Sequence, residues 1–196
     1  MKGTVGDSAA DPLSPLMPSR TDLIRLLTAY RARSEAEGAF RLRMLDLAAA
    51  ANDPFSRYDY RPGHFTASAF VAHPGGASVL VVHHRKLGFW VQPGGHIDPD
   101  DASPLDAAAR EAVEEAGVVD LRPILEGPVH LDVHTFPETS DQPEHLHFDL
   151  RFGFVAGGTD LSPSDEVHEV KWVAPADLTA AGAHQDLVEP ISRVLG

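Results

Sequence analysis

The chain contains no cysteine, and this absence excludes several kinds of chemistry. Disulfides, thiolate metal ligands and cysteine nucleophiles are ruled out together. Long hydrophobic runs are missing too: the longest, such as residues 79–82, fall far short of the roughly 18 apolar residues that a membrane span needs. The first residues include proline, serine and aspartate but no apolar segment typical of a secretory signal. We therefore expect a cytoplasmic protein without a membrane partner.

Basic residues are scarce as well: 16 Lys and Arg stand against 29 Asp and Glu, for a net charge of −13 at pH 7. An acidic surface repels nucleic-acid backbones, so we expect no nucleic-acid partner. A small phosphorylated substrate is still compatible with this charge, because a bound metal ion or a local basic cluster can reverse the field in one pocket. The length of 196 residues and the hydrophobic content of 43% are typical of one globular domain with a short appendage.

The chain is predicted to have three parts. Residues 1–19 contain several prolines and are predicted to be a flexible tail. Residues 20–58 show apolar residues at helical spacing and are predicted to be a helical extension of two helices, the second ending before Pro54. This extension either packs on the main domain or serves as a dimer contact or a substrate lid; a homodimer is therefore one of the alternatives. Residues 59–196 are predicted to form the main domain.

Beyond residue 63 the pattern changes to short extended segments separated by turns. Two segments joined by a Pro-Gly-Gly turn are predicted to form a hairpin. The predicted strands are residues 64–72, 78–83, 129–136, 145–155 and 169–173, and helical segments are expected at residues 103–117, 175–179 and 185–195. Such an irregular mixture packs naturally as a mixed sheet with helices on both faces, so we predict an α/β fold of the mixed α+β kind.

The helix predicted near residues 104–116 has clear start and stop signals. Ser103 suits the N-cap, Pro104 suits the first helical position, and Asp106 lies where a capping acid is expected. Gly117 suits a left-handed C-cap. This helix begins shortly after a glycine-rich segment, which is a favourable place for a binding site.

Three glutamates gather towards the end of this helix, where like charges and the helix dipole both disfavour them. They are Glu111, Glu114 and Glu115. Two interpretations are open at this point. The glutamates form an acidic face in water, with an ion pair between Arg110 and Glu114, or they converge on a divalent cation such as Mg²⁺, which prefers carboxylate oxygens.

The residues around these glutamates resemble the Nudix box. That motif is a glycine, five residues, Glu, seven residues, then Arg-Glu, an aliphatic residue, any residue, Glu-Glu, any residue, Gly and an aliphatic residue. Here Gly95 is followed after five residues by Asp101, and later by Arg110-Glu111-Ala112-Val113-Glu114-Glu115-Ala116-Gly117-Val118. Aspartate replaces the first glutamate, eight residues separate it from the arginine, and Ala112 is a small occupant of the aliphatic position. The resemblance covers about residues 64–195.

This resemblance implies a Nudix-like α/β/α sandwich and a hydrolase dependent on Mg²⁺ or Mn²⁺. The reaction it implies is cleavage of a pyrophosphate bond in a nucleoside diphosphate linked to another moiety, so the expected partner is a small phosphorylated, nucleotide-derived substrate. The implied metal ligands are Glu111, Glu114, Glu115 and the carbonyl group of Gly94, and Arg110 would orient the glutamates. The alternative is a non-catalytic nucleotide-sensing or interaction domain on the same fold. An isopentenyl-diphosphate isomerase is disfavoured, because in the resembling family that chemistry relies on cysteine.

Several other polar residues are candidates for roles in such a site. Glu166 is a candidate general base on a later loop, or a solvated loop acid. His96, in the glycine-rich segment, could reach a substrate. Strand alternation places four polar side chains on one face of residues 145–155, where they either line a pocket and bind substrate or face solvent: His145, His147, Asp149 and Arg151. Residues 83–86 form a dense basic patch that is either a phosphate contact or an exposed strand end.

Overall fold

The computed structural model describes residues 18–183 and 187–195. Most of the predicted tail, and the predicted start of the last helix at residues 185–186, lie outside that part. The elements in chain order are α1 (Arg20–Ala29), α2 (Glu35–Ala50), β1 (Gly63–Ala72), β2 (Val79–His84), β3 (Trp90–Val91), β4 (Gly94–His96), α3 (Pro104–Ala116), β5 (Arg122–Pro123), β6 (His130–Phe136), β7 (His145–Val155), β8 (Val167–Val173), the 3-10 helix η1 (Pro175–Asp177) and α4 (Val188–Leu195).

The predicted helices and strands are present, most with ends shifted by a few residues. Three short strands were not predicted: β3, β4 and β5. The strand β4 lies in the segment that we expected to be a glycine-rich loop. It pairs antiparallel with β1, with Thr66 opposite His96 and Ser68 opposite Gly94. Side-chain patterns do not reveal such a strand, because its pairing is made by the backbone alone.

The sheet is mixed. The strands β1 and β7 run parallel in continuous register from Gly63↔Leu146 to Ala72↔Val155. The other strand pairs are antiparallel, and the main order is β3-β2-β1-β7-β5, with β4, β6 and β8 pairing to β1, β7 and β2. β1 therefore pairs with β4 in its middle, from Thr66 to Ser68, and meets β2 only at its far end, Ala72↔Val79. β4 thus replaces β2 as the neighbour of β1 in this part of the sheet.

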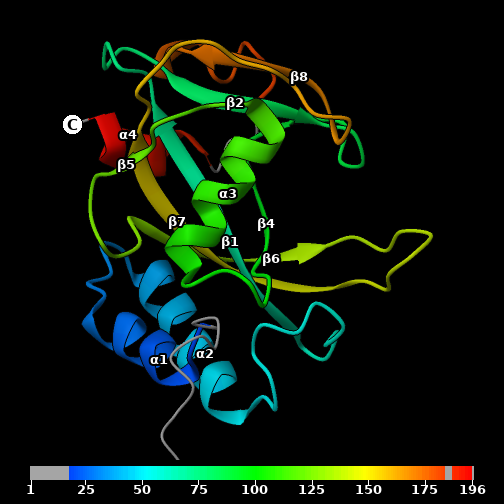
Figure 1. Cartoon of the computed structure of the whole chain (residues 1–196). Coiled ribbons are helices and arrows are strands. Elements are labelled where there is room, and N and C mark those ends of the chain that lie inside the picture. Colours follow the sequence, from blue (N-terminus) through cyan, green and yellow to red (C-terminus); the bar gives the residue numbers. More distant parts are fainter. Residues whose placement is uncertain (1–17, 184–186, 196) are drawn as a thin grey trace, which may run out of the picture.

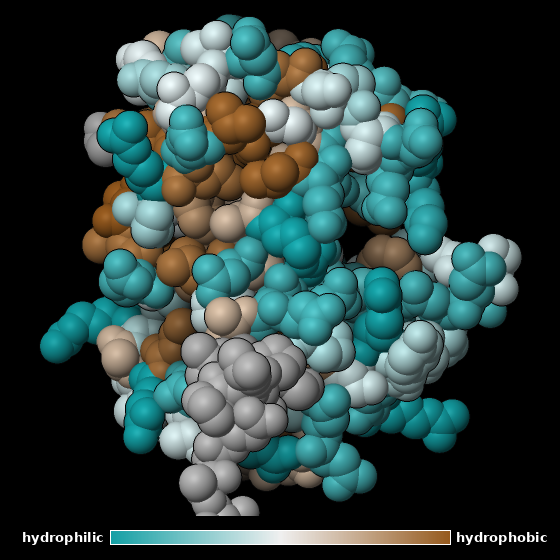
Figure 2. All heavy atoms as spheres, viewed as in Figure 1, coloured by the Kyte–Doolittle hydropathy of each residue, from teal (hydrophilic) through white to brown (hydrophobic). Residues whose placement is uncertain are grey.

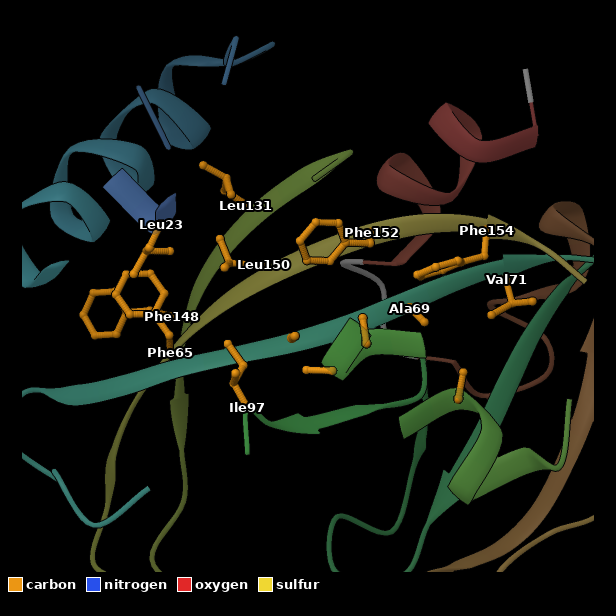
Figure 3. Packing of buried hydrophobic residues seen from close by; sticks show 14 of the residues in the cluster. Leu23, Phe65, Ala69, Val71, Ile97, Leu131, Phe148, Leu150, Phe152 and Phe154 are labelled. Atoms are coloured by element: carbon orange, nitrogen blue, oxygen red, sulfur yellow. The ribbon is translucent and has the colours of Figure 1, made fainter. Parts of the chain in front are cut away.

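Helices cover both faces of the sheet, as predicted. On one face α3 lies across β1 and the pair α1 and α2 lies at the lower end of the sheet (Figure 1). The core on this side contains alternate residues of β1 and β7, including Phe65 and Phe148, whose ring centroids are 5.8 Å apart, close to Leu23 of α1 (Figure 3). On the opposite face, Phe70 of β1 packs in a second cluster with Ile191 of α4. Burial of these two apolar layers is the main source of stability.

The N-terminal helices pack on the rest of the chain through buried apolar side chains and through an ion pair between α2 and α4. Leu23, Leu27, Met44, Leu47 and Ala48 belong to the same core cluster as β1 and β7. Glu37 of α2 accepts a hydrogen bond from Arg193 of α4 at 2.7 Å, and the side chains of this pair are only 1% and 4% exposed. The hydroxyl group of Tyr30 also donates to Glu37. The helical extension thus packs on the main domain; a lid or dimer role stays a prediction. No helix in the described part of the chain is long and apolar enough to span a membrane.

Candidate active site

The helix α3 forms where the local signals place it. The hydroxyl oxygen of Ser103 accepts a hydrogen bond from the backbone N–H of Asp106 at 3.2 Å, and Gly117 ends the helix with a left-handed φ of 67°. Small side chains on one stripe of the helix are fully buried against the sheet: Ala107, Ala108, Ala112 and Ala116. Because alanines let the helix approach closely, the glutamates on the neighbouring stripe are brought against the backbone of β4.

Glu111 and Glu115 are carboxylates in a poorly solvated position. Glu115 is 3% exposed, and its Oε2 accepts a hydrogen bond from the N–H of Gly94 at 3.1 Å. Burial raises the pKa of Glu115 to about 8 and that of Glu111 to about 7, and the mutual repulsion of neighbouring glutamates adds to both shifts. Glu114 is different, since its side chain is 57% exposed. Two poorly exposed carboxylates with raised pKa values are a frequent feature of metal and catalytic sites.

Arg110 is bound to several acceptors around these glutamates. Its Nε and Nη2 donate to the two carboxylate oxygens of Asp101 at 2.9 and 3.0 Å. Its Nη1 donates to Glu114 at 2.9 Å and to Glu111 at 3.1 Å, and Nη2 also reaches the carbonyl oxygen of His96 at 2.9 Å. The expected ion pair with Glu114 is therefore present, within a larger network. Asp101 contacts the arginine despite the longer spacing, because the extra residue is accommodated before α3.

Two glycines allow the close contact between β4 and its surroundings. A Cβ atom on Gly95 would lie 2.6 Å from Oε1 of Glu111. A Cβ atom on Gly94 would lie 2.4 Å from Oγ of Ser68 and 2.8 Å from its Cα. Both distances are shorter than contacts between non-bonded atoms allow. A side chain at either position would displace a neighbour, so the carboxylates and the floor of the site both require glycine here.

The glutamates border a cleft of about 700 Å³. Its opening is visible as a hollow with a hydrophilic rim between α3 and the β6–β7 hairpin (Figure 2). The floor is a grid of polar side chains that strand register aligns across β6, β7 and β1. One row is His134 and His147, continued on β1 by His64, which does not itself line the cleft, and the next is Asp132, Asp149 and Thr66. The face of β7 that we predicted from alternation therefore lines a pocket at His147, Asp149 and Arg151.

Arg151 lies at the floor of this cleft, held between two aspartates. Its Nε donates to Asp149 at 2.9 Å and its Nη2 to Asp132 at 2.7 Å. Asp149 also accepts from the hydroxyl groups of Ser68 and Thr66, at 2.8 and 3.1 Å. The remaining Nη1 of Arg151 is buried and has no hydrogen-bond partner among the described residues. That nitrogen is an unsatisfied buried donor on a residue that lines the cleft.

The histidines of the site are only partly those predicted. His96 and His147 line the cleft, and burial lowers their pKa values to about 3 and about 2, so both rings are neutral at physiological pH. His145 lies behind His147, with the two Nε2 atoms 3.1 Å apart, and does not itself line the cleft. His134 of the cleft lining was missed, as was His64, which lies beside His147 without lining the cleft. Alternation of polar residues along β1 and β6 was a signal for them, but which face meets the site depends on strand pairing.

The loop acid and the basic patch are also at the cleft. Glu166 lines it and is exposed, and its charge contributes to raising the pKa values of Glu111 and Glu115. From the basic patch, His84 and Lys86 line the same cleft. Carboxylates and basic side chains thus line the same cavity, a combination that suits a phosphorylated ligand bound together with a metal ion.

Comparisons with known proteins agree on one family. The family model described as “NUDIX domain” matches residues 62–194. A protein of Bacillus subtilis (strain 168) named “Putative 8-oxo-dGTP diphosphatase” is 31% identical over 100 residues, which are 51% of this chain and 60% of that protein. This chain therefore matches less than two thirds of that relative's length. The crystal structure of a hydrolase of the NUDIX family from Clostridium perfringens is similar with a TM-score of 0.55 and 25% identity, over 67% of this chain and 95% of that one.

Proposed function

This chain belongs to the NUDIX family, and from that premise we propose that it hydrolyses a pyrophosphate bond in a nucleotide-derived substrate with Mg²⁺ or Mn²⁺. The observation that carries the proposal is a pair of glutamates on α3, the buried Glu115 and the 14% exposed Glu111, which line a polar cleft. Buried carboxylates are costly unless a cation or a proton compensates their charge. A divalent cation compensates both at once.

The residues present fit a hard divalent cation. Glu111 and Glu115 supply oxygen ligands, Glu114 is the next carboxylate on the same helix, and the backbone of Gly94 lies against Glu115. Mg²⁺ prefers such oxygen ligands and keeps several waters. When bound there, the metal would neutralise charge on phosphate oxygens and lower the pKa of a bound water. Arg110 would hold the glutamates in place through its contacts with Glu111, Glu114 and Asp101.

The remaining cleft residues would bind the substrate and move the proton. We propose Glu166 as the general base, because it is a carboxylate that lines the cleft and interacts electrostatically with the α3 glutamates. Lys86 and the free Nη1 of Arg151 are donors for phosphate oxygens. His96 and His147 are neutral rings on the cleft wall that would contact the rest of the substrate.

The cleft volume of about 700 Å³ is within the range of pockets that bind nucleotide-sized ligands. The Bacillus subtilis relative is named for 8-oxo-dGTP, so oxidised and ordinary nucleoside triphosphates are the first substrates to test. The alternative of a non-catalytic nucleotide-sensing domain is not favoured, because the glutamate set is complete and faces the cleft.

A hydrolysis screen tests this proposal. The full-length protein is incubated with 8-oxo-dGTP, the ordinary nucleoside triphosphates, ADP-ribose, nucleotide sugars and dinucleoside polyphosphates, each with Mg²⁺, with Mn²⁺ or with EDTA. We expect turnover of at least one substrate that EDTA abolishes, with products cut at a phosphoanhydride bond. Nucleotide binding without turnover under every metal condition would overturn the proposal in favour of a sensing domain.

The role of Glu166 has its own test on the substrate found in that screen. Glu166→Gln removes a base while keeping the shape of the side chain. We expect kcat to fall by about 10²–10⁴ with KM nearly unchanged, because loss of a general base slows the chemical step. Glu169→Gln, three residues further along in β8 and outside the cleft lining, is the matched control. Equal kcat values for the two variants would remove Glu166 from the mechanism.

A further inference from the structure

Three histidines from three strands converge, two of them on the cleft wall, and none of them is a proposed metal ligand of the α3 site. They are His64 of β1, His96 of β4 and His147 of β7. Register places His64 opposite His147, while His96 approaches from the other side of β1. One nitrogen of each ring lies within 4.8 Å of the other two. The centroid of the His64 ring is 5.0 Å from that of His96 and 5.2 Å from that of His147.

The hydrogen bonding of His64 leaves one nitrogen ready to bind a cation. Its Nδ1 lies 3.1 Å from the carbonyl oxygen of Asp59, and because a carbonyl only accepts, Nδ1 carries the proton. The other nitrogen, Nε2, therefore holds a lone pair. It is fully buried and has no hydrogen-bond partner within the described part of the chain. A ring that donates one N–H to the backbone and turns its free nitrogen into a cluster is the usual arrangement of a metal-bound histidine.

The hydrogen bonding of His96 shows that the Arg57 side chain competes with a cation for this ring. Its Nε2 is also buried without a partner among the described residues, and its Nδ1 accepts a hydrogen bond from Arg57 at 2.8 Å. Since a guanidinium only donates, the neutral ring carries its proton on Nε2. Binding a cation there requires the proton to move to Nδ1 and Arg57 to turn away. The Arg57 side chain is 48% exposed and also lies 4.0 Å from Asp98, so another partner is within reach.

We propose that His64, His96 and His147 form a binding site for a transition-metal dication of the Zn²⁺ or Co²⁺ type, separate from the glutamate site. Imidazole nitrogens suit these metals, whereas Mg²⁺ prefers the carboxylate oxygens of α3. Three protein ligands leave a fourth position open, and it faces the cleft because His96 and His147 line it. This site does not depend on the proposed hydrolase activity.

Cobalt binding to the full-length, metal-depleted protein tests the site, because tetrahedral Co²⁺ has a distinctive visible spectrum. The titration is made with excess Mg²⁺ present, which occupies the glutamates. We expect one Co²⁺ per chain, displaced by one equivalent of Zn²⁺. His64→Gln and His147→Gln should each weaken Co²⁺ binding by more than about tenfold, since even the loss of an outer hydrogen bond to a metal ligand costs 10–100-fold. Arg57→Ala should tighten it.

Two control variants separate this site from its neighbours. His134→Gln changes a histidine of the same cleft that is bonded to Asp132 at 2.8 Å and lies outside the trio, and Glu115→Gln disrupts the glutamate site. Both should bind Co²⁺ as the wild type does. The proposal is overturned if the wild type binds no Co²⁺, or if Glu115→Gln loses the signal while His64→Gln keeps it.

A measurement on the wild type decides the question even if a histidine variant fails to fold. Imidazole nitrogen signals in NMR spectra report directly which rings bind a cation. One equivalent of Zn²⁺ should shift the signals of His64, His96 and His147 and leave that of His134 in place. Unchanged signals of the trio on addition of Zn²⁺ would contradict the site.

Discussion

Replacing Glu115 by glutamine should stabilise the metal-free protein, although the same change should abolish its function. The carboxyl group is 3% exposed, and its pKa is raised from an ordinary 4.5 to about 8. At pH values between 4.5 and about 8, the Glu115 carboxyl group is protonated in the folded state but ionised in the unfolded chain. Stability therefore falls as the pH rises through this window. Glutamine has no charge to bury and can still accept the hydrogen bond from Gly94.

The size of the effect follows from the shift. At pH 7 the ionisation of Glu115 in the unfolded chain costs the wild type about 3 kcal/mol of folding free energy, and at pH 5 it costs less than about 1 kcal/mol. For a chain of this size, about 3 kcal/mol corresponds to a rise in Tm of roughly 6–12 °C. Glu115→Gln should thus raise Tm strongly at pH 7 and weakly at pH 5.

The assay is thermal unfolding in EDTA, followed by circular dichroism at both pH values. Glu114→Gln is the control, because the Glu114 side chain is 57% exposed and an exposed ion pair contributes about 0–1 kcal/mol. Adding Mg²⁺ should raise the Tm of the wild type by mass action and leave that of Glu115→Gln unchanged. A metal-free Glu115→Gln variant that is less stable than the wild type at pH 7, or equally shifted at both pH values, would refute the reasoning.

Two further substitutions test other parts of the structure. Gly95→Ala should lower kcat while the protein stays folded, because the added Cβ would lie 2.6 Å from Oε1 of Glu111 and displace that carboxylate; wild-type kinetics would contradict this. Arg193→Ala should reduce the free energy of unfolding in urea by about 3–5 kcal/mol, since it leaves the buried carboxylate of Glu37 without the arginine that pairs with its charge. Arg25→Ala, which removes an exposed ion pair, should change it by less than about 1 kcal/mol, and similar losses in both variants would show that burial is not the cause.

The helix that carries the glutamates was predictable from local sequence. Its start at Ser103 and Pro104 and its end at Gly117 depend on backbone chemistry within a few residues, so the sequence alone defines them. The motif then identified the family, and membership in it is confirmed by the match over residues 62–194. The mixed sheet with helices on both faces is also confirmed, because the irregular order of strands and helices permits few other packings.

The sequence predicted which side chains share a face at the floor of the cleft, but not that this face lines a pocket. Alternation along β7 placed His147 and Arg151 on one face, but whether that face met solvent or a pocket stayed open. The answer depends on β1 running parallel to β7 and on β6 pairing with β7 from the other side. These pairings join residues far apart in the chain. The histidine trio depends in the same way on the pairing of β1 with β7 and with β4, which is why His64 attracted no attention in the sequence.

The account's central claim is that the α3 glutamates support a metal-dependent cleavage of a pyrophosphate bond. Its most direct test is the Mg²⁺-dependent kcat of the wild type and of Glu115→Gln, measured side by side on the best substrate of the screen. The account predicts that Glu115→Gln folds, with a metal-free Tm at least as high as that of the wild type, and loses turnover by orders of magnitude. Near-normal turnover in a folded Glu115→Gln protein would contradict it.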